Sequence, residues 1–203
     1  MLSCSDSRVS VPLLFSQLHL GQIFEIKNAG NLVDKSCLES IKYAISYINP
    51  APELIVVLGH TRCGAVTACF KYYEHNDCGH LKEDFPFTVT QMQQPMACAL
   101  AAHSGFSSDD SVDSITKMAA QKNVQMQVSL IREQLGEILD CYKINLAQAM
   151  YDVDSGEVKF IVENRLQTCP AYVEFEDVMQ AARKRARNAR GTTSDSIDWI
   201  LSY

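Results

Sequence analysis

The fold is decided by the stretch Glu53-Leu54-Ile55-Val56-Val57-Leu58, a short and almost uninterrupted apolar run. Such a run is typical of a strand that is buried on both faces. It follows Asn49-Pro50-Ala51-Pro52, a sequence that ends any preceding helix. A strand buried on both faces needs covering layers, so this run indicates a sheet with helices packed on it.

The residues before this strand have the pattern of an amphipathic helix. Ser36-x-x-Glu39 matches a capping box, which marks a helix start. Apolar residues then recur at helical spacing and predict one apolar stripe, made of Cys37, Ile41, Ala44, Ile45 and Ile48. A helix next to a buried strand favours an α/β fold.

The rest of the chain extends this pattern. Residues 1–8 and 21–26 predict two more strands, and helical connections between strands favour parallel pairing. We therefore predict a mostly parallel central sheet flanked by helices, in a single domain over residues 1–203. The other expected elements are helices at 65–73, 88–103 and 112–139, a loop at 74–87, a hairpin of 144–153 with 158–162, a last helix at 175–190 and a tail at 194–203.

Composition narrows the class of protein. The chain has 203 residues, of which 47% are hydrophobic and 21% charged, enough for one core and too few for two ordinary domains. Its net charge of −6 provides no basic field for nucleic acid or an anionic membrane, so a small solute is the favoured partner. The longest apolar run is far shorter than the roughly 20 residues of a membrane helix. With no secretory signal visible, we expect a cytoplasmic protein.

The cysteine count favours thiols over disulfides. Eight cysteines could form four disulfides, but that framework belongs to short secreted chains that lack a core. We therefore expect reduced thiols. Most of them have the ordinary role of small buried side chains, an interpretation that covers Cys37, Cys69, Cys98, Cys141 and Cys169.

Two short motifs carry reactive side chains. Cys4-Ser5-Asp6-Ser7-Arg8 alternates a thiol, a carboxylate and a guanidinium, so an extended segment would place them on one face. His60-Thr61-Arg62-Cys63 comes just past the carboxyl end of the buried strand, where open parallel sheets form their sites. We predict that Cys4, His60 and Cys63 converge from neighbouring strand ends.

Two thiolates and one imidazole suit Zn²⁺, and three protein ligands leave one position open for water. Zinc would acidify that water to a hydroxide nucleophile. Asp6 is placed to accept a hydrogen bond from this hydroxide. Arg8 is placed to pair with the Asp6 carboxylate and keep it ionised. Without the cysteines and His60, Asp6 and Arg8 would equally suit a structural ion pair. A second metal site around His75, Cys78 and His80 is less favoured than a solvated loop.

These residues resemble the β-class carbonic anhydrases, whose signature is C-x-D-x-R followed by H-x-x-C. The resemblance runs from about residue 2 to about residue 162. It includes Lys27-Asn28-Ala29-Gly30-Asn31, the strand Val56-Val57-Leu58-Gly59-His60, Asn123-Val124 with Gln127, and Tyr151-Asp152 with Gly156. Lys27 stands where family members usually carry arginine, which keeps the charge and weakens any bidentate role.

The resemblance implies reversible hydration of CO₂ to bicarbonate and a proton, with one Zn²⁺ per chain. Zinc-bound hydroxide would attack CO₂, Asp6 would orient it, and Arg8 would position Asp6. Val9 and Gly64 would line the CO₂ pocket, and the chain would form a homodimer or a higher assembly. Family chains normally carry helices before the first ligand, which wrap the partner and supply a glutamine. We expect that arm to be absent here, since Cys4 is the fourth residue.

Two other functions fit the same residues. One is hydrolysis of CS₂ or COS, which some proteins of this fold perform. The other is a zinc-stabilised assembly or sensing protein without catalysis. The three hypotheses differ in substrate and turnover, which the sequence does not show.

Overall fold

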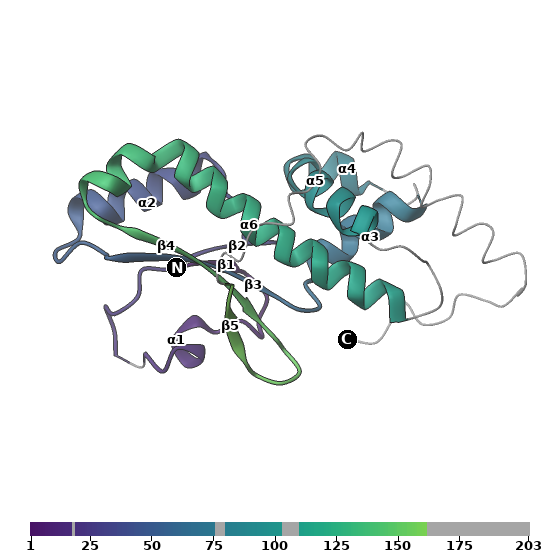
Figure 1. Cartoon of the computed structure of the whole chain (residues 1–203), viewed down its shortest axis with the longest axis horizontal. Helices are drawn as coiled ribbons and strands as arrows, with labels where there is room; N and C mark the ends of the chain where they lie inside the picture. The colour runs from purple at the N-terminus through teal and green to yellow at the C-terminus, as the bar shows by residue number, and fades with distance from the viewer. Residues whose placement is uncertain (18, 76–79, 103–109, 162–203) are drawn as a thin grey trace, which may run out of the picture.

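A five-stranded sheet forms the centre of the molecule (Figure 1). The computed structural model describes residues 1–17, 19–75, 80–102 and 110–161. The strand order is β2-β1-β3-β4-β5, with the first four parallel and β5 antiparallel to β4. The strands are β1 (Leu2–Cys4), β2 (Ile26–Asn28), β3 (Leu54–His60), β4 (Asn145–Tyr151) and β5 (Val158–Phe160). The prediction of a mostly parallel sheet and of a closing hairpin is confirmed.

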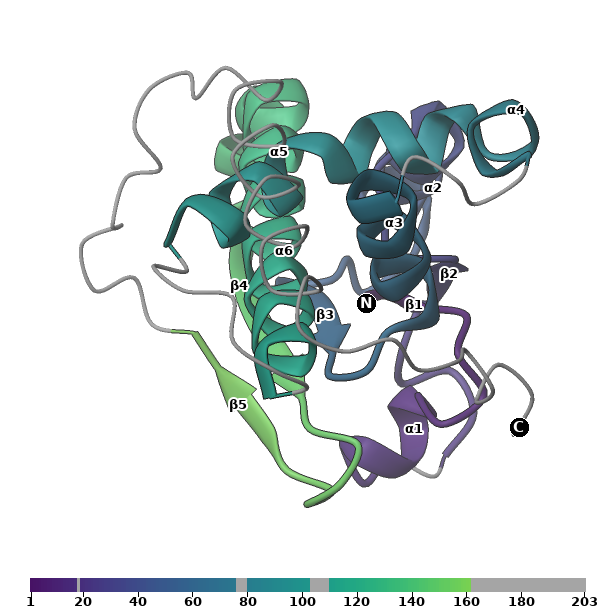
Figure 2. The ribbon, with the colours of Figure 1, turned by 90° about the vertical axis from the view of Figure 1, so that its right-hand side faces the viewer.

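Helices cover the sheet unequally. Helices α2 (Lys35–Tyr47) and α6 (Asp110–Cys141) lie over one face, and α1 (Val11–Leu14) lies beneath the other (Figure 1). Beyond the carboxyl end of β3, the chain forms α3 (Gly64–His75), α4 (Leu81–Asp84) and α5 (Pro86–Ala102). Figure 2 shows α5 beside the long helix α6, against which it packs. The site described below lies where β3 gives way to α3.

The burial of both faces of β3 explains why the sequence of this strand is apolar throughout. Ile55 and Val57 belong to the main core between the sheet and its helices. Val56 and Leu58 point to the other face, where they join a smaller cluster with Val11. Alternate residues of one strand therefore reach two separate cores, as the uninterrupted run predicts.

The start of α2 differs from the prediction. The N-cap is Asp34, whose carboxylate accepts a 2.6 Å hydrogen bond from the Cys37 N–H. The capping box at Ser36 and Glu39 is therefore wrong. Asp34 has the extended backbone that an N-cap requires, whereas Ser36 already lies inside the helix. The predicted apolar stripe is correct, since Cys37, Ile41, Ala44 and Ile45 are buried.

Strand β2 also differs from the prediction. It was expected at 21–26 and lies at Ile26–Asn28. Its partner β1 has three residues, and the register pairs Leu2 with Ile26 and Cys4 with Asn28. Gly21 has a φ of +86°, which no strand residue adopts. The expected loop at 74–87 is interrupted by α4 and by the start of α5.

Several further expectations have mixed outcomes. Cys37 and Cys69 are free and buried as predicted, whereas Cys141 is exposed. Cys98 is disulfide-bonded, so the expectation of a reduced thiol is wrong there. No helix in the described part of the chain is both long and apolar enough to cross a bilayer. The expected helix at 175–190 and the tail at 194–203 lie outside the described residues.

Candidate metal centre

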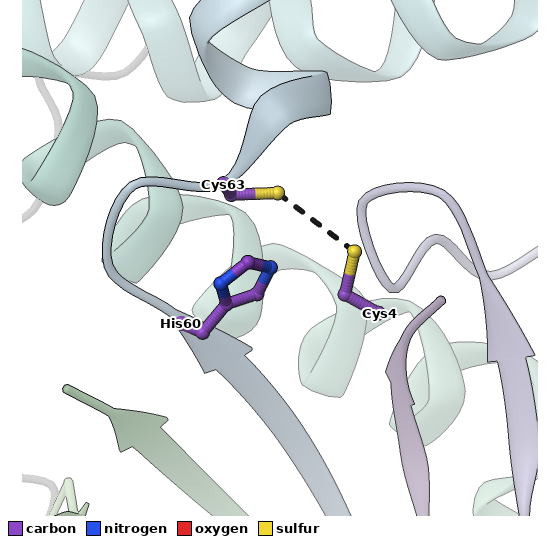
Figure 3. Close-up of side chains that lie close together, drawn as sticks. All are labelled: Cys4, His60 and Cys63. Carbon is purple, nitrogen blue, oxygen red and sulfur yellow. Dashed lines mark hydrogen bonds between the residues drawn. The ribbon is translucent and has the colours of Figure 1, made fainter. Parts of the chain in front are cut away.

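The three predicted ligands lie together at the carboxyl ends of adjacent strands (Figure 3). Cys4 ends β1, His60 ends β3, and Cys63 follows in the turn before α3. Their ligand atoms all lie within 4.8 Å of one another, and the two sulfurs are 3.9 Å apart. All three residues are buried, so water does not compete freely for their ligand atoms.

The imidazole of His60 is oriented for metal binding. Its Nδ1 lies 3.0 Å from the carbonyl oxygen of Thr61. Because a carbonyl only accepts, Nδ1 carries the hydrogen, and Nε2 keeps its lone pair. Nε2 is fully buried and has no hydrogen-bond partner among the described residues. An unpartnered buried nitrogen beside two sulfurs is the donor set that a zinc ion would satisfy.

The two thiols share a proton. Cys63 hydrogen-bonds to Cys4 and lowers the pKa of Cys4 to about 4, with smaller contributions from His60 and from the Gly30 N–H, which donates at 3.4 Å. The same contact raises the pKa of Cys63, and burial adds to that effect. The contact thus favours the thiolate at Cys4, and a bound cation would favour loss of the proton from Cys63 as well.

Asp6 and Arg8 form a bidentate pair beside these ligands. Arg8 donates from Nε to Oδ1 at 2.9 Å and from Nη2 to Oδ2 at 2.7 Å. These bonds lower the pKa of Asp6 to about 2. Asp6 Oδ2 lies 3.9 Å from His60 Nε2. The carboxylate is therefore ionised and adjoins the ligand group.

Val9 and Gly64 are each next in sequence to a residue of the two motifs, Arg8 and Cys63. The Val9 N–H donates to the Asp6 carbonyl at 3.0 Å, and Val9 is buried in the smaller apolar cluster. Lys27 Nζ donates to the Val9 carbonyl at 2.5 Å. Gly64 begins α3, and no atom of the residues that the structure describes lies within 4 Å of the position that a Cβ would take. Their role in a CO₂ pocket stays a prediction.

A polar support beneath Cys4 was not assigned from the sequence. The loop after β2 turns at Gly30, whose carbonyl accepts from Asn123 Nδ2 at 2.8 Å. Gln127, one helical turn later on α6, donates to Asn123 and accepts from the Val33 N–H, at 2.9 and 2.8 Å. This support fixes the loop whose Gly30 N–H meets Cys4. The sequence feature that could have indicated this support is the i, i+4 spacing of the Asn123 and Gln127 amides on one helix.

Replacing Gln127 by leucine is expected to lower the free energy of unfolding by about 3 kcal/mol. The change leaves the Val33 N–H without its acceptor and Asn123 without its donor in a buried site. Urea denaturation measures the loss. The matched control is Gln125→Leu, on a half-buried position of the same helix, with an expected change of about 0.5 kcal/mol or less. Equal stabilities of the two variants would contradict the assigned support.

Fold and centre together define a mixed α/β protein that carries a metal-capable Cys-His-Cys group at the ends of parallel strands. Comparison with protein families agrees with that class, because the carbonic anhydrase family model matches residues 1–158. The chain belongs to the β-class carbonic anhydrase family.

Individual relatives show the extent of the likeness. A carbonic anhydrase of Synechococcus elongatus is 32% identical over 172 residues, which are 77% of this chain and 57% of the relative. The chain thus spans little more than half the length of that protein. The β-carbonic anhydrase of Coccomyxa, solved with acetazolamide, superposes with a TM-score of 0.64 at 24% identity, over 80% of this chain and 70% of that one. The tetrameric β-carbonic anhydrases of Sordaria macrospora superpose with a TM-score of 0.64 at 20% identity, over 79% of this chain and 78% of that one.

Proposed function

We propose that this chain is a zinc-dependent carbonic anhydrase that interconverts CO₂ with bicarbonate and a proton. The observation that carries the proposal is the convergence of Cys4, His60 and Cys63 beside an ionised Asp6. Family membership supports it, since the named relatives are carbonic anhydrases.

In this proposal the two sulfurs and His60 Nε2 hold one Zn²⁺. When bound, zinc supplies the Lewis acidity that turns water into a nucleophile near neutral pH. Each protein group has a matching task. The Thr61 carbonyl holds the proton of His60 on Nδ1, which keeps Nε2 available. Cys4 and Cys63 are buried, which limits competition by water at their sulfurs.

Asp6 would orient the attacking oxygen. An ionised carboxylate accepts hydrogen bonds and donates none. It would therefore accept a hydrogen bond from the O–H of the attacking oxygen and so direct a lone pair of that oxygen toward CO₂. Arg8 donates two hydrogen bonds to Oδ1, from its backbone N–H and from Nε, and one to Oδ2 from Nη2, which keeps the carboxylate ionised far below neutral pH. Val9 and Gly64 are the proposed lining of the CO₂ pocket.

Assembly and compartment belong to the same proposal. The Sordaria structures are tetrameric β-carbonic anhydrases, and we propose a homodimer or a higher homo-oligomer for this chain. We propose the cytoplasm as the compartment, because Cys4 and Cys63 are free thiols and must stay reduced to bind metal, although Cys98 is disulfide-bonded.

Asp6→Asn tests the proposal. The amide donates where the carboxylate accepts, so the rate of CO₂ hydration is expected to fall by on the order of 10²-fold, while zinc content stays at one per chain. Stopped-flow hydration with a pH indicator, together with metal analysis, gives both quantities. Asp140→Asn is the control, since that carboxylate is 76% exposed and pairs with Arg132 away from the ligands.

Other outcomes separate the rival functions. Zinc uptake with no turnover in the unmutated protein would contradict carbonic anhydrase activity and favour an assembly or sensing role. Turnover of COS or CS₂ in place of CO₂ would favour the hydrolase. Full activity in Asp6→Asn would contradict the role given to this carboxylate.

A further inference from the structure

The three residues that follow β3 connect all parts of the metal centre. The Thr61 carbonyl accepts from His60 Nδ1 at 3.0 Å. The Arg62 carbonyl accepts from Arg8 Nη2 at 3.1 Å, the same nitrogen that holds Asp6. Cys63 is itself a ligand candidate. The geometry of this turn therefore sets the positions of the imidazole, the carboxylate pair and one sulfur at once.

This turn is not a relaxed one. Arg62 has a φ of +51°, a left-handed conformation that costs a non-glycine residue energy. Such a conformation persists only where surrounding contacts hold it. The contacts must come from outside the turn, because its own carbonyls already serve His60 and Arg8.

The outside contacts come from the hairpin of β4 and β5. The Thr61 N–H donates to the Tyr151 carbonyl at 2.9 Å, where β4 ends. The Thr61 hydroxyl oxygen accepts from the Val153 N–H at 3.0 Å. Arg62 forms an ion pair with Asp154 in the same hairpin. Thr61 is 7% exposed, so water does not readily replace its two hydrogen bonds to the hairpin.

We propose that Thr61 is a positioning residue through which the β4–β5 hairpin fixes the imidazole of His60 for metal binding. Its hydroxyl and N–H bond the turn to the hairpin. Its carbonyl accepts from His60 Nδ1, which keeps the hydrogen on that nitrogen and fixes the orientation of the ring. The inference rests on the proposed metal centre and adds a residue that contacts no metal.

Thr61→Val tests this role with almost no change in shape. Valine keeps the branched side chain and leaves the Val153 N–H without its acceptor. Affinity for Co²⁺, a spectroscopic substitute for zinc, is expected to fall about 10-fold. The visible absorption of bound cobalt should also change, because it depends on ligand geometry. Thr61→Ser keeps the hydroxyl and is expected to restore both the affinity and the spectrum.

The controls separate this inference from the proposed function. If the unmutated protein binds no cobalt, the metal centre itself is wrong and the inference is overturned with it. If the unmutated protein binds cobalt and Thr61→Val has the same affinity and spectrum, only the role of Thr61 is overturned. Equal losses in the valine and serine variants would also overturn it, since the hydroxyl would then be irrelevant.

A second measurement needs no variant and covers the case in which Thr61→Val fails to fold. Coupling between two sites is reciprocal, so metal binding must strengthen the bond between Val153 and Thr61 if that bond strengthens metal binding. Hydrogen exchange of the Val153 amide in the unmutated protein is expected to slow on addition of zinc. Unchanged exchange at a saturating zinc concentration would overturn the proposal.

Discussion

Cys4→Ser is expected to lower the affinity for Zn²⁺ by on the order of 10²-fold or more. A serine hydroxyl has nearly the shape of the thiol but holds its proton far more tightly, so it does not replace a thiolate. The Gly30 N–H, which donates to the Cys4 sulfur, keeps an acceptor in serine. The variant is therefore expected to fold. Competition titration with a chromophoric chelator measures the affinity.

The control is the same substitution at Cys37. This cysteine is equally buried, on α2, and burial raises its pKa to about 11, so it stays protonated at neutral pH. Cys37→Ser is expected to retain the affinity of the unmutated protein, corrected for any loss of folded material. One tightly bound zinc per chain in Cys4→Ser would show that the ligand set is misassigned.

Gly59→Ala is expected to destabilise the fold by about 3 kcal/mol. A Cβ at this position of β3 would lie 2.5 Å from Val124 Cγ2 and 2.8 Å from Met150 Sδ. Real atoms do not approach so closely, so α6 must move away from the sheet or the strand must shift. His60 is the next residue, and a shift of the strand displaces it as well. Thermal and urea denaturation, with metal content measured in parallel, report both effects.

Two further variants identify the cause of that loss. In the described part of the chain, the Cβ of Gly136→Ala on α6 would meet only Arg132 Cδ, at 3.8 Å, so the change is expected to stabilise the fold by about 0.5 to 1 kcal/mol, as alanine does in helices. The double variant Gly59→Ala with Val124→Ala removes the nearest obstacle. It is expected to be more stable than the sum of the two single changes predicts. Strict additivity would contradict direct contact between the two positions.

Local sequence was sufficient for the parts of the fold that one segment determines by itself. The apolar run of β3 and the stripe of α2 both describe a surface that must be buried, and both elements were predicted. The position of β2 was not predictable in this way, because the register with three residues of β1 decides it. The cap of α2 was missed for a related reason. Asp34 and Ser36 are both good caps, and only the path of the preceding chain selects one.

The same distinction applies to the metal centre. The meeting of Cys4, His60 and Cys63 followed from two short motifs and the rule that sites form at strand ends. The supports were not predictable from spacing alone. Gln127 reaches Val33 across 94 residues, and Thr61 meets Val153 across 92. Backbone partners carry no sequence signal, so such bonds become visible only in the folded chain.

The place of β1 between β2 and β3 has a consequence for the order of events during synthesis. Cys4 precedes its sulfur neighbour Cys63 by 59 residues. At a synthesis rate of about 5 to 20 residues per second, roughly 3 to 12 seconds pass between the synthesis of Cys4 and that of Cys63. Strand β1 is thus made before both of the strands that pair with it, β2 and β3. Docking of β3 beside it, rather than the appearance of any ligand, sets the moment at which the nascent chain can capture a metal ion.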